Sequence, residues 1–140
     1  MHKIMMVVEN PQIAELFRTY MDNYGYEAIV VDDFDNILHS FLSIQPDLVL
    51  MTVNLPGYDG YYWSRQIREV SNCPILFISD RFAVLDEMMI HENGAADYIA
   101  KPFSFEAVTR KIRAHLYRAY GDYSQYEAFE QKDINGKSFG

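Results

Sequence analysis

The chain has 140 residues and a hydrophobic content of 49%, which is typical of one globular domain with its own core. Twenty Asp and Glu against twelve Lys and Arg give a net charge of -8, so direct binding of nucleic acid or an anionic membrane is disfavoured and protein partners are favoured. The single cysteine, Cys73, excludes an internal disulfide and a cysteine-based metal cluster. No apolar run approaches the roughly 18 residues of a membrane-spanning helix, so a reducing cytoplasm is the expected location.

Short apolar runs alternate along the chain with stretches of helical periodicity. The runs are rich in Val, Ile and Leu, suit strands buried on both faces, and span residues 3–8, 27–31, 48–51, 74–78 and 97–100. The first helix is expected to begin at Asn10-Pro11, because Asn caps free amides and Pro loses no hydrogen bond at the first helical position. The last helix is expected at about residues 104–119.

Five strand and helix units in succession predict an α/β fold. Parallel neighbours need right-handed crossovers, so the sheet should be covered on both faces, and the flavodoxin-like order 2-1-3-4-5 with five helices is expected. Residues 1–120 are predicted to form this domain. Residues 121–140 are polar and lose the helical period, which indicates a linker or tail.

Several polar residues fall where the predicted strands end. In doubly wound sheets the functional site lies beyond the carboxyl ends of the strands, beside strands one and three. Those two ends carry Val8, Glu9 and Thr52, and the fourth and fifth strands add Ser79 and Lys101. The sequence therefore predicts a cleft with one carboxylate, two hydroxyl groups and one lysine.

Ordered motifs over residues 3–119 resemble bacterial response-regulator receiver domains of the OmpR/PhoB type. These motifs are "KIMMVVENP", "PDLVLMTVNLPGYDG", "CPILFIS", "GAADYIAKPF" and "RKIRAHLYR". Within that group, "YDGYYWSRQIREVSNCPILFIS" is similar to the BceR/GraR regulators, which answer bacitracin and other cell-envelope peptide antibiotics.

The resemblance implies a phosphorylation pocket that has lost part of its chemistry. In the family, an Asp at the end of strand three accepts a phosphoryl group from a histidine kinase, and two acidic residues after strand one help to hold Mg²⁺. Thr52 stands at the acceptor position, and Val8 with Glu9 at the acidic pair. The other matched positions are Asn54 in the pocket, Ser79 as the hydroxyl that reports phosphorylation, Tyr98 as the aromatic switch and Lys101 as the phosphoryl contact.

These replacements argue against phosphoryl transfer. A carboxylate attacks phosphorus as an anion, whereas the hydroxyl of Thr52 needs a base, and the motifs place no histidine at this rim. Glu9 alone, beside Lys101, would make a weak and nearly neutral Mg²⁺ site, so no cofactor, no metal site and no catalytic residue are expected. We expect Glu9 and Lys101 to pair directly. Thr52 is interpreted first as a β-branched strand end with its hydroxyl on a backbone carbonyl, and only second as a phosphorylatable threonine.

The resemblance also implies dimerisation through the fourth helix, fifth strand and fifth helix. Asp97 and Lys111 match one of the family's intermolecular salt bridges, while Glu87 and Ala107 cannot form the neighbouring one. Exposed ion pairs contribute little, so a weak or concentration-dependent homodimer is expected to use apolar contacts. The candidates are Ile112, Leu116 and the face of residues 84–90.

Three functional classes compete. The favoured one is an atypical receiver that regulates transcription without aspartyl phosphorylation and touches DNA only through a domain after the tail, absent from this chain. The second is a stand-alone adaptor that binds a histidine kinase or a transporter component. A flavodoxin-like enzyme is disfavoured, because no Gly-rich phosphate loop follows strand one and no nucleophile has a base. An engineered Thr52 is also disfavoured, since Val8 has lost its carboxylate as well.

Overall fold

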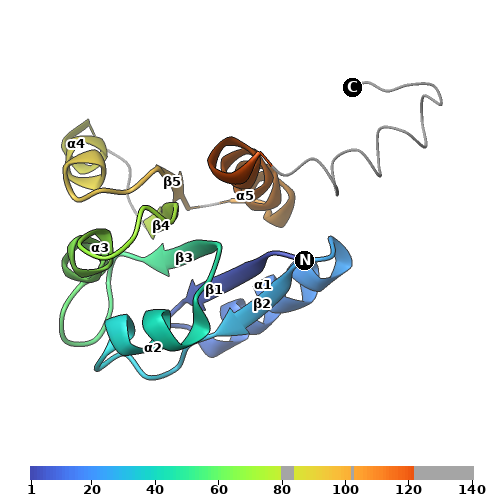
Figure 1. The fold of residues 1–140 in the computed structure, drawn as a ribbon, viewed down its shortest axis with the longest axis horizontal. Helices are drawn as coiled ribbons and strands as arrows, with labels where there is room; N and C mark the ends of the chain where they lie inside the picture. Colours follow the sequence, from blue (N-terminus) through green and yellow to red (C-terminus); the bar gives the residue numbers. More distant parts are fainter. Residues whose placement is uncertain (80–83, 102, 122–140) are drawn as a thin grey trace.

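The computed structural model describes residues 1–79, 84–101 and 103–121 and shows one parallel five-stranded sheet (Figure 1). The sheet order is β2-β1-β3-β4-β5, and every neighbouring pair is parallel, so the predicted fold class is confirmed. The strands are β1 (Lys3–Val7), β2 (Glu27–Val30), β3 (Leu48–Thr52), β4 (Ile75–Ser79) and β5 (Asp97–Ala100).

One helix follows each strand along the described part of the chain. The helices are α1 (Pro11–Asn23), α2 (Ile37–Ile44), α3 (Gly60–Arg68), α4 (Val84–Glu92) and α5 (Phe105–Tyr120). Asn10 caps α1 by accepting hydrogen bonds from the amides of Gln12 and Ile13 at 2.9 and 3.1 Å, as predicted. Asp59 caps α3 in the same way through the amide of Tyr62.

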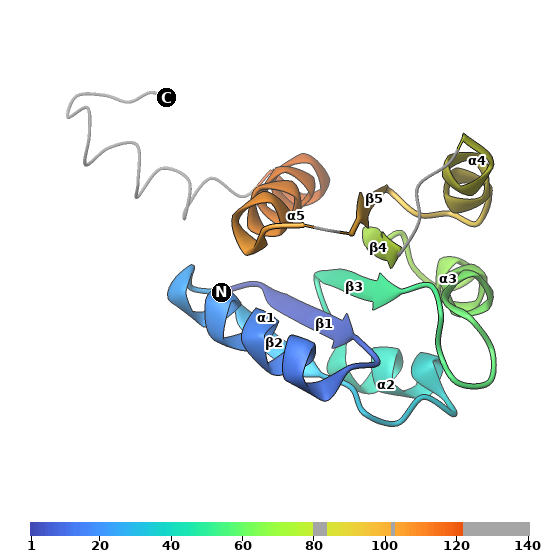
Figure 2. The ribbon, with the colours of Figure 1, turned by 180° about the vertical axis from the view of Figure 1, so that it is seen from behind.

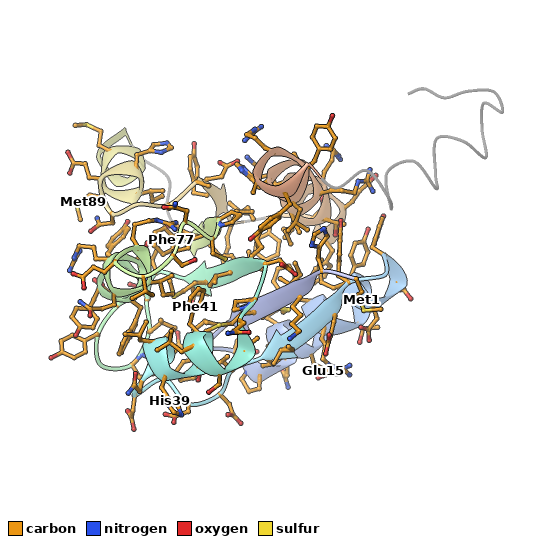
Figure 3. All side chains as sticks on the ribbon, viewed as in Figure 1. Met1, Glu15, His39, Phe41, Phe77 and Met89 are labelled. Atoms are coloured by element: carbon orange, nitrogen blue, oxygen red, sulfur yellow. The ribbon has the colours of Figure 1, made fainter. Side chains whose placement is uncertain are left out.

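Two apolar layers hold the helices to the sheet. Alternate residues of the buried strands face opposite sides: Ile4 and Met6 of β1 join the core beneath α1 and α5, whereas Met5 and Val7 join the core beneath α2, α3 and α4. Figures 1 and 2 show α1 and α2 on opposite faces of the sheet. Figure 3 labels Phe41 and Phe77, which belong to the core beneath α2, α3 and α4. None of the described helices is long and apolar enough to cross a bilayer.

The buried face of α5 contradicts the prediction that Ile112 and Leu116 form part of a dimer surface. Ile112 and Leu116 are only 0% and 3% exposed and pack with Val108 against the sheet and α1. Both side chains belong to the core of the monomer, so they cannot supply a dimer surface. Ile90 of α4 is likewise buried, at 1% exposure.

The C-terminal end of α5 is fastened to the amino end of the sheet. The hydroxyl of Tyr120 donates a hydrogen bond to the carbonyl oxygen of Asp47 at 2.7 Å, and the ring of His2 stacks on Tyr120 with centroids 5.7 Å apart. Gly121 ends the helix in the left-handed region, at φ 60°, and its amide bonds the carbonyl of Tyr117. The predicted tail from residue 122 onward lies outside the described residues.

Candidate functional site

A pocket of about 70 Å³ lies at the carboxyl ends of β1 and β3, where the sequence predicts the site. Five of the six residues predicted for the pocket line it, namely Val8, Glu9, Thr52, Asn54 and Lys101. Asn10, Ile13, Ile78 and Phe103 complete its wall. The sixth, Ser79, ends β4 and does not line the pocket among the described residues.

Thr52 is half-buried at the end of β3, and its hydroxyl is engaged with the backbone. Its Oγ1 donates a hydrogen bond to the carbonyl oxygen of Val7 at 3.3 Å, which is the geometry expected for a strand-end threonine. A carbonyl oxygen cannot remove the hydroxyl proton, and no histidine is among the described residues that line the pocket. In this arrangement the hydroxyl of Thr52 is bonded to a backbone carbonyl oxygen and not to a histidine.

The two residues that follow β1 differ sharply in exposure. Val8 is 4% exposed and belongs to the core beneath α1 and α5, whereas Glu9 is exposed at the rim. Mg²⁺ is usually held by one or two carboxylates together with water or phosphate oxygens, and Val8 contributes only hydrocarbon. Glu9 is the one carboxylate among the described residues of the pocket wall, and the described residues contain no group of three His, Cys, Asp or Glu side chains able to hold a metal ion.

Lys101 and the two switch residues surround the ends of β4 and β5. The amide of Lys101 donates to the carbonyl of Ser79 at 2.9 Å, which joins these strand ends. The Lys101 side chain shares the pocket with Glu9, and their direct pairing stays a prediction. Tyr98 is half-buried against the core beneath α4, and its ring centroid lies 5.9 Å from Nζ of Lys111.

The predicted intermolecular pair Asp97 and Lys111 is formed within one chain. Nζ of Lys111 lies 3.1 Å and Nε2 of His115 lies 2.9 Å from Oδ2 of Asp97, while the Tyr98 amide donates to Oδ1. Burial opposes ionisation of Asp97, but the bonds from His115, the Tyr98 amide and Lys111 outweigh it and hold the pKa of the carboxyl group below its usual value. The sequence reasoning missed His115, although its spacing of four from Lys111 on one helix was an available signal.

Arg68 is a second residue that sequence reasoning missed. Its guanidinium group donates to the carbonyl oxygens of Ser71, Cys73 and Gly94 and so ties the end of α3 to the segments before β4 and β5. The neighbouring Cys73 is buried, and burial raises the pKa of its thiol to about 12, which makes it unreactive. No local sequence pattern indicates this role of Arg68, because its hydrogen-bond acceptors are backbone atoms.

The fold and the pocket define a class, the doubly wound α/β domains with a site beyond the ends of β1 and β3. Residues 4–113 match the family described as the response regulator receiver domain. The chain is 49% identical over 124 residues to the transcriptional regulatory protein YxdJ of Bacillus subtilis, with 89% of this chain and 54% of that protein covered. It is 38% identical over 117 residues to the response regulator protein GraR of Staphylococcus saprophyticus, with 84% and 52% covered.

Solved structures agree with these sequence matches. The N-terminal domain of the nisin resistance regulator NsrR superposes with a TM-score of 0.75 at 32% identity, covering 82% of this chain and 97% of that domain. The BeF₃-activated receiver domain of Klebsiella pneumoniae RstA gives a TM-score of 0.77 at 28% identity, covering 81% and 97%.

The chain belongs to the response regulator receiver domain family, and its relatives include OmpR/PhoB-type resistance regulators. It spans about half the length of the curated relatives that it matches.

Proposed function

We propose that this chain is the receiver domain of a cytoplasmic two-component transcriptional regulator and that it works without phosphorylation of an aspartate. One observation carries the proposal: the hydroxyl of Thr52 is bonded to the carbonyl of Val7 at the position where the family resemblance places the phosphoryl acceptor. The packing of Val8 into the core supports it, because this position then offers no carboxylate to a metal.

Phosphoryl transfer from a phosphohistidine or a small phosphodonor needs an anionic nucleophile and a way to offset the charge of the phosphoryl oxygens. Thr52 supplies an un-ionised hydroxyl. Among the described residues of the pocket wall, Glu9 is the single carboxylate and Lys101 the single cationic side chain. The pocket is therefore a receiver pocket without acceptor chemistry.

In this proposal the activity of the regulator depends on contacts with other proteins and not on phosphorylation. We infer a weak homodimer through α4, β5 and α5, because Asp97 and Lys111 already neutralise one another within the chain and offer little to a second copy. The exposed Met88 and Met89 on α4 remain as apolar contacts on this side. Binding of DNA is assigned to a domain outside this chain, and a histidine kinase or a transporter component is the expected upstream partner. An adaptor without DNA output is the alternative, which DNA binding by the full-length protein would eliminate.

The deciding experiment is the intact mass of the purified chain after incubation with acetyl phosphate and Mg²⁺. Thr52→Asp and the double variant Val8→Asp with Thr52→Asp are treated in parallel. We expect no added phosphoryl group on the native chain and one on the double variant, because only the latter restores both the acceptor and a second carboxylate. A phosphorylated native chain, with the site mapped to Thr52 or Asp59, would overturn the proposal.

A further inference from the structure

A cleft at the amino ends of β4 and β5 gathers basic side chains in a chain whose net charge is -8. It has a volume of about 350 Å³, and its polar side chains are Arg68, Asn72, His115 and Arg118. No Asp or Glu is among the described residues that line it. The cleft lies at the opposite end of the sheet from the pocket around Thr52, so its chemistry is independent of that pocket.

Arg68 forms a fixed, positively charged wall of the cleft. It is half-buried, and burial lowers the pKa of its guanidinium group, which shows that water solvates this charge poorly. Its four hydrogen bonds go to carbonyl oxygens, and no carboxylate within the described residues forms an ion pair with it. Four of its five N–H groups are thus engaged with neutral carbonyl oxygens of the described residues.

Arg118 of α5 lines the same cleft as Arg68. Its Nη1 lies 3.2 Å from Nδ1 of His115, while Nε2 of His115 lies 2.9 Å from Oδ2 of Asp97. A guanidinium group can only donate, so in this geometry Nδ1 of His115 accepts from Arg118 and Nε2–H donates to Asp97. Within the described residues, the exposed Arg118 engages one N–H, on Nδ1 of His115.

We propose that this cleft binds a small, doubly charged oxyanion of the phosphate class between Arg68 and Arg118. Guanidinium groups bind such anions through paired N–H donors, and the exposed amide of Asn72 adds a neutral donor. The charge of Asp97, which His115 contacts, is already offset by its bonds to Lys111 and His115. Glu69 and Glu92 line a neighbouring cleft that shares Arg68 and Gly94.

Proton uptake by His115 should strengthen this binding. The charged or titratable groups that face its ring are Asp97 on β5, Lys111 and Arg118 on α5, and Arg68 across the cleft from α3. A protonated ring keeps its bond to Asp97 but can no longer accept from Arg118, so Nδ1–H and the released guanidinium both become donors for an anion. Anion binding and protonation of His115 then favour one another.

The first experiment titrates the full chain with inorganic phosphate and with sulfate, using chloride at matched ionic strength as the reference. Binding is followed by the amide NMR signals of Asn72 and Gly94. We expect saturable shifts with both oxyanions and not with chloride. Arg118→Gln should weaken binding by about tenfold or more, the loss expected for a charge-assisted contact. Arg110→Gln, an exposed arginine of α5 that does not line this cleft, should bind like the native chain.

The second experiment measures sulfate binding between about pH 8 and pH 5.5, the range over which histidine side chains take up a proton. Sulfate keeps its charge there, whereas phosphate does not. Affinity should rise as the pH falls in the native chain and stay constant in His115→Gln, which still donates to Asp97. Thermal melting first establishes that each variant is folded.

Three results would overturn the proposed site. The first is that phosphate and sulfate shift the NMR signals no more than chloride does, and the second is that Arg118→Gln and Arg110→Gln lose equal affinity. The third is that the shifted signals belong to residues away from Asn72 and Gly94. A pH dependence that persists in His115→Gln would overturn the role of His115. Phosphorylation of the pocket around Thr52 bears on none of these outcomes.

Discussion

Thr52 links the ends of β3 and β1 through a single hydroxyl group. Thr52→Val removes that hydroxyl and keeps the β-branched shape, so we expect the free energy of unfolding to fall by about 0.5 to 1.5 kcal/mol, the usual net contribution of one hydrogen bond. Urea-induced unfolding measures the change. Thr52→Ser keeps the hydroxyl and serves as the control. A Thr52→Val variant as stable as the native chain would mean that this bond contributes nothing.

Asp97 ties the stability of the fold to pH. Its pKa in the folded chain is lower than in the unfolded chain, so the ionised group stabilises the fold above the unfolded value of about 4 and loses this effect as the pH falls through the folded value. We expect Asp97→Asn to be less stable than the native chain at neutral pH and the gap to close below about pH 4.

Denaturant unfolding at several pH values tests this, with Asp32→Asn on an exposed loop as the control. A gap between Asp97→Asn and the native chain that has the same size in acid and at neutral pH would show that the bonds of Asp97 do not depend on its charge.

At the scale of elements, α5 shows how one periodic pattern supports two interpretations. Val108, Ile112 and Leu116 recur every four residues, which predicts one apolar face but does not say whether the sheet or a second copy covers it. The sequence interpretation assigned Ile112 and Leu116 to a partner, and in the structure the monomer buries them. The cap at Asn10 was predicted correctly, because its side chain bonds amides only two and three residues away.

Leu116→Ala should therefore act on folding. We expect a loss of about 2 to 5 kcal/mol in the free energy of unfolding, as for other large-to-small changes in a packed core. Arg110→Ala, on the exposed side of the same helix, should stay within about 0.5 kcal/mol of the native chain. Chemical denaturation and sedimentation are measured together. A Leu116→Ala chain of native stability that has lost self-association would restore the interface assignment.

At the scale of the whole molecule, the order of strands and helices was predictable because buried parallel strands and amphipathic helices have different apolar periods. The pocket was predictable because topology fixes where strand ends meet. The hydrogen bonds of Arg68 and His115 at the other end of the sheet were not predictable from the sequence. Arg68 bonds carbonyl groups up to 26 residues away and His115 bonds a carboxylate 18 residues away, so neither contact has a local signature.

Magnesium provides a test on the intact domain. A ligand that binds only the folded state raises the melting temperature, and the native pocket offers too few carboxylates for Mg²⁺ to do so. We expect no shift for the native chain between Mg²⁺ and a potassium salt of equal ionic strength. The Val8→Asp and Thr52→Asp double variant should gain stability with Mg²⁺. A native chain stabilised as strongly as the double variant would show that Glu9 recruits ligands beyond this donor set.

The contacts of Tyr120 with Asp47 and His2 hold the C-terminal end of α5 against the amino end of the sheet. The 16 residues of α5 form a rod of about 24 Å whose first turn lies near the pocket and whose last turn is anchored at the far end of the sheet. Because both contacts lie at its last turn, this end of α5 should keep its place against the sheet when the pocket around Thr52 changes. Tyr120→Phe removes the hydrogen bond to Asp47 but keeps the ring that stacks on His2, so it should loosen this end of α5 without releasing it.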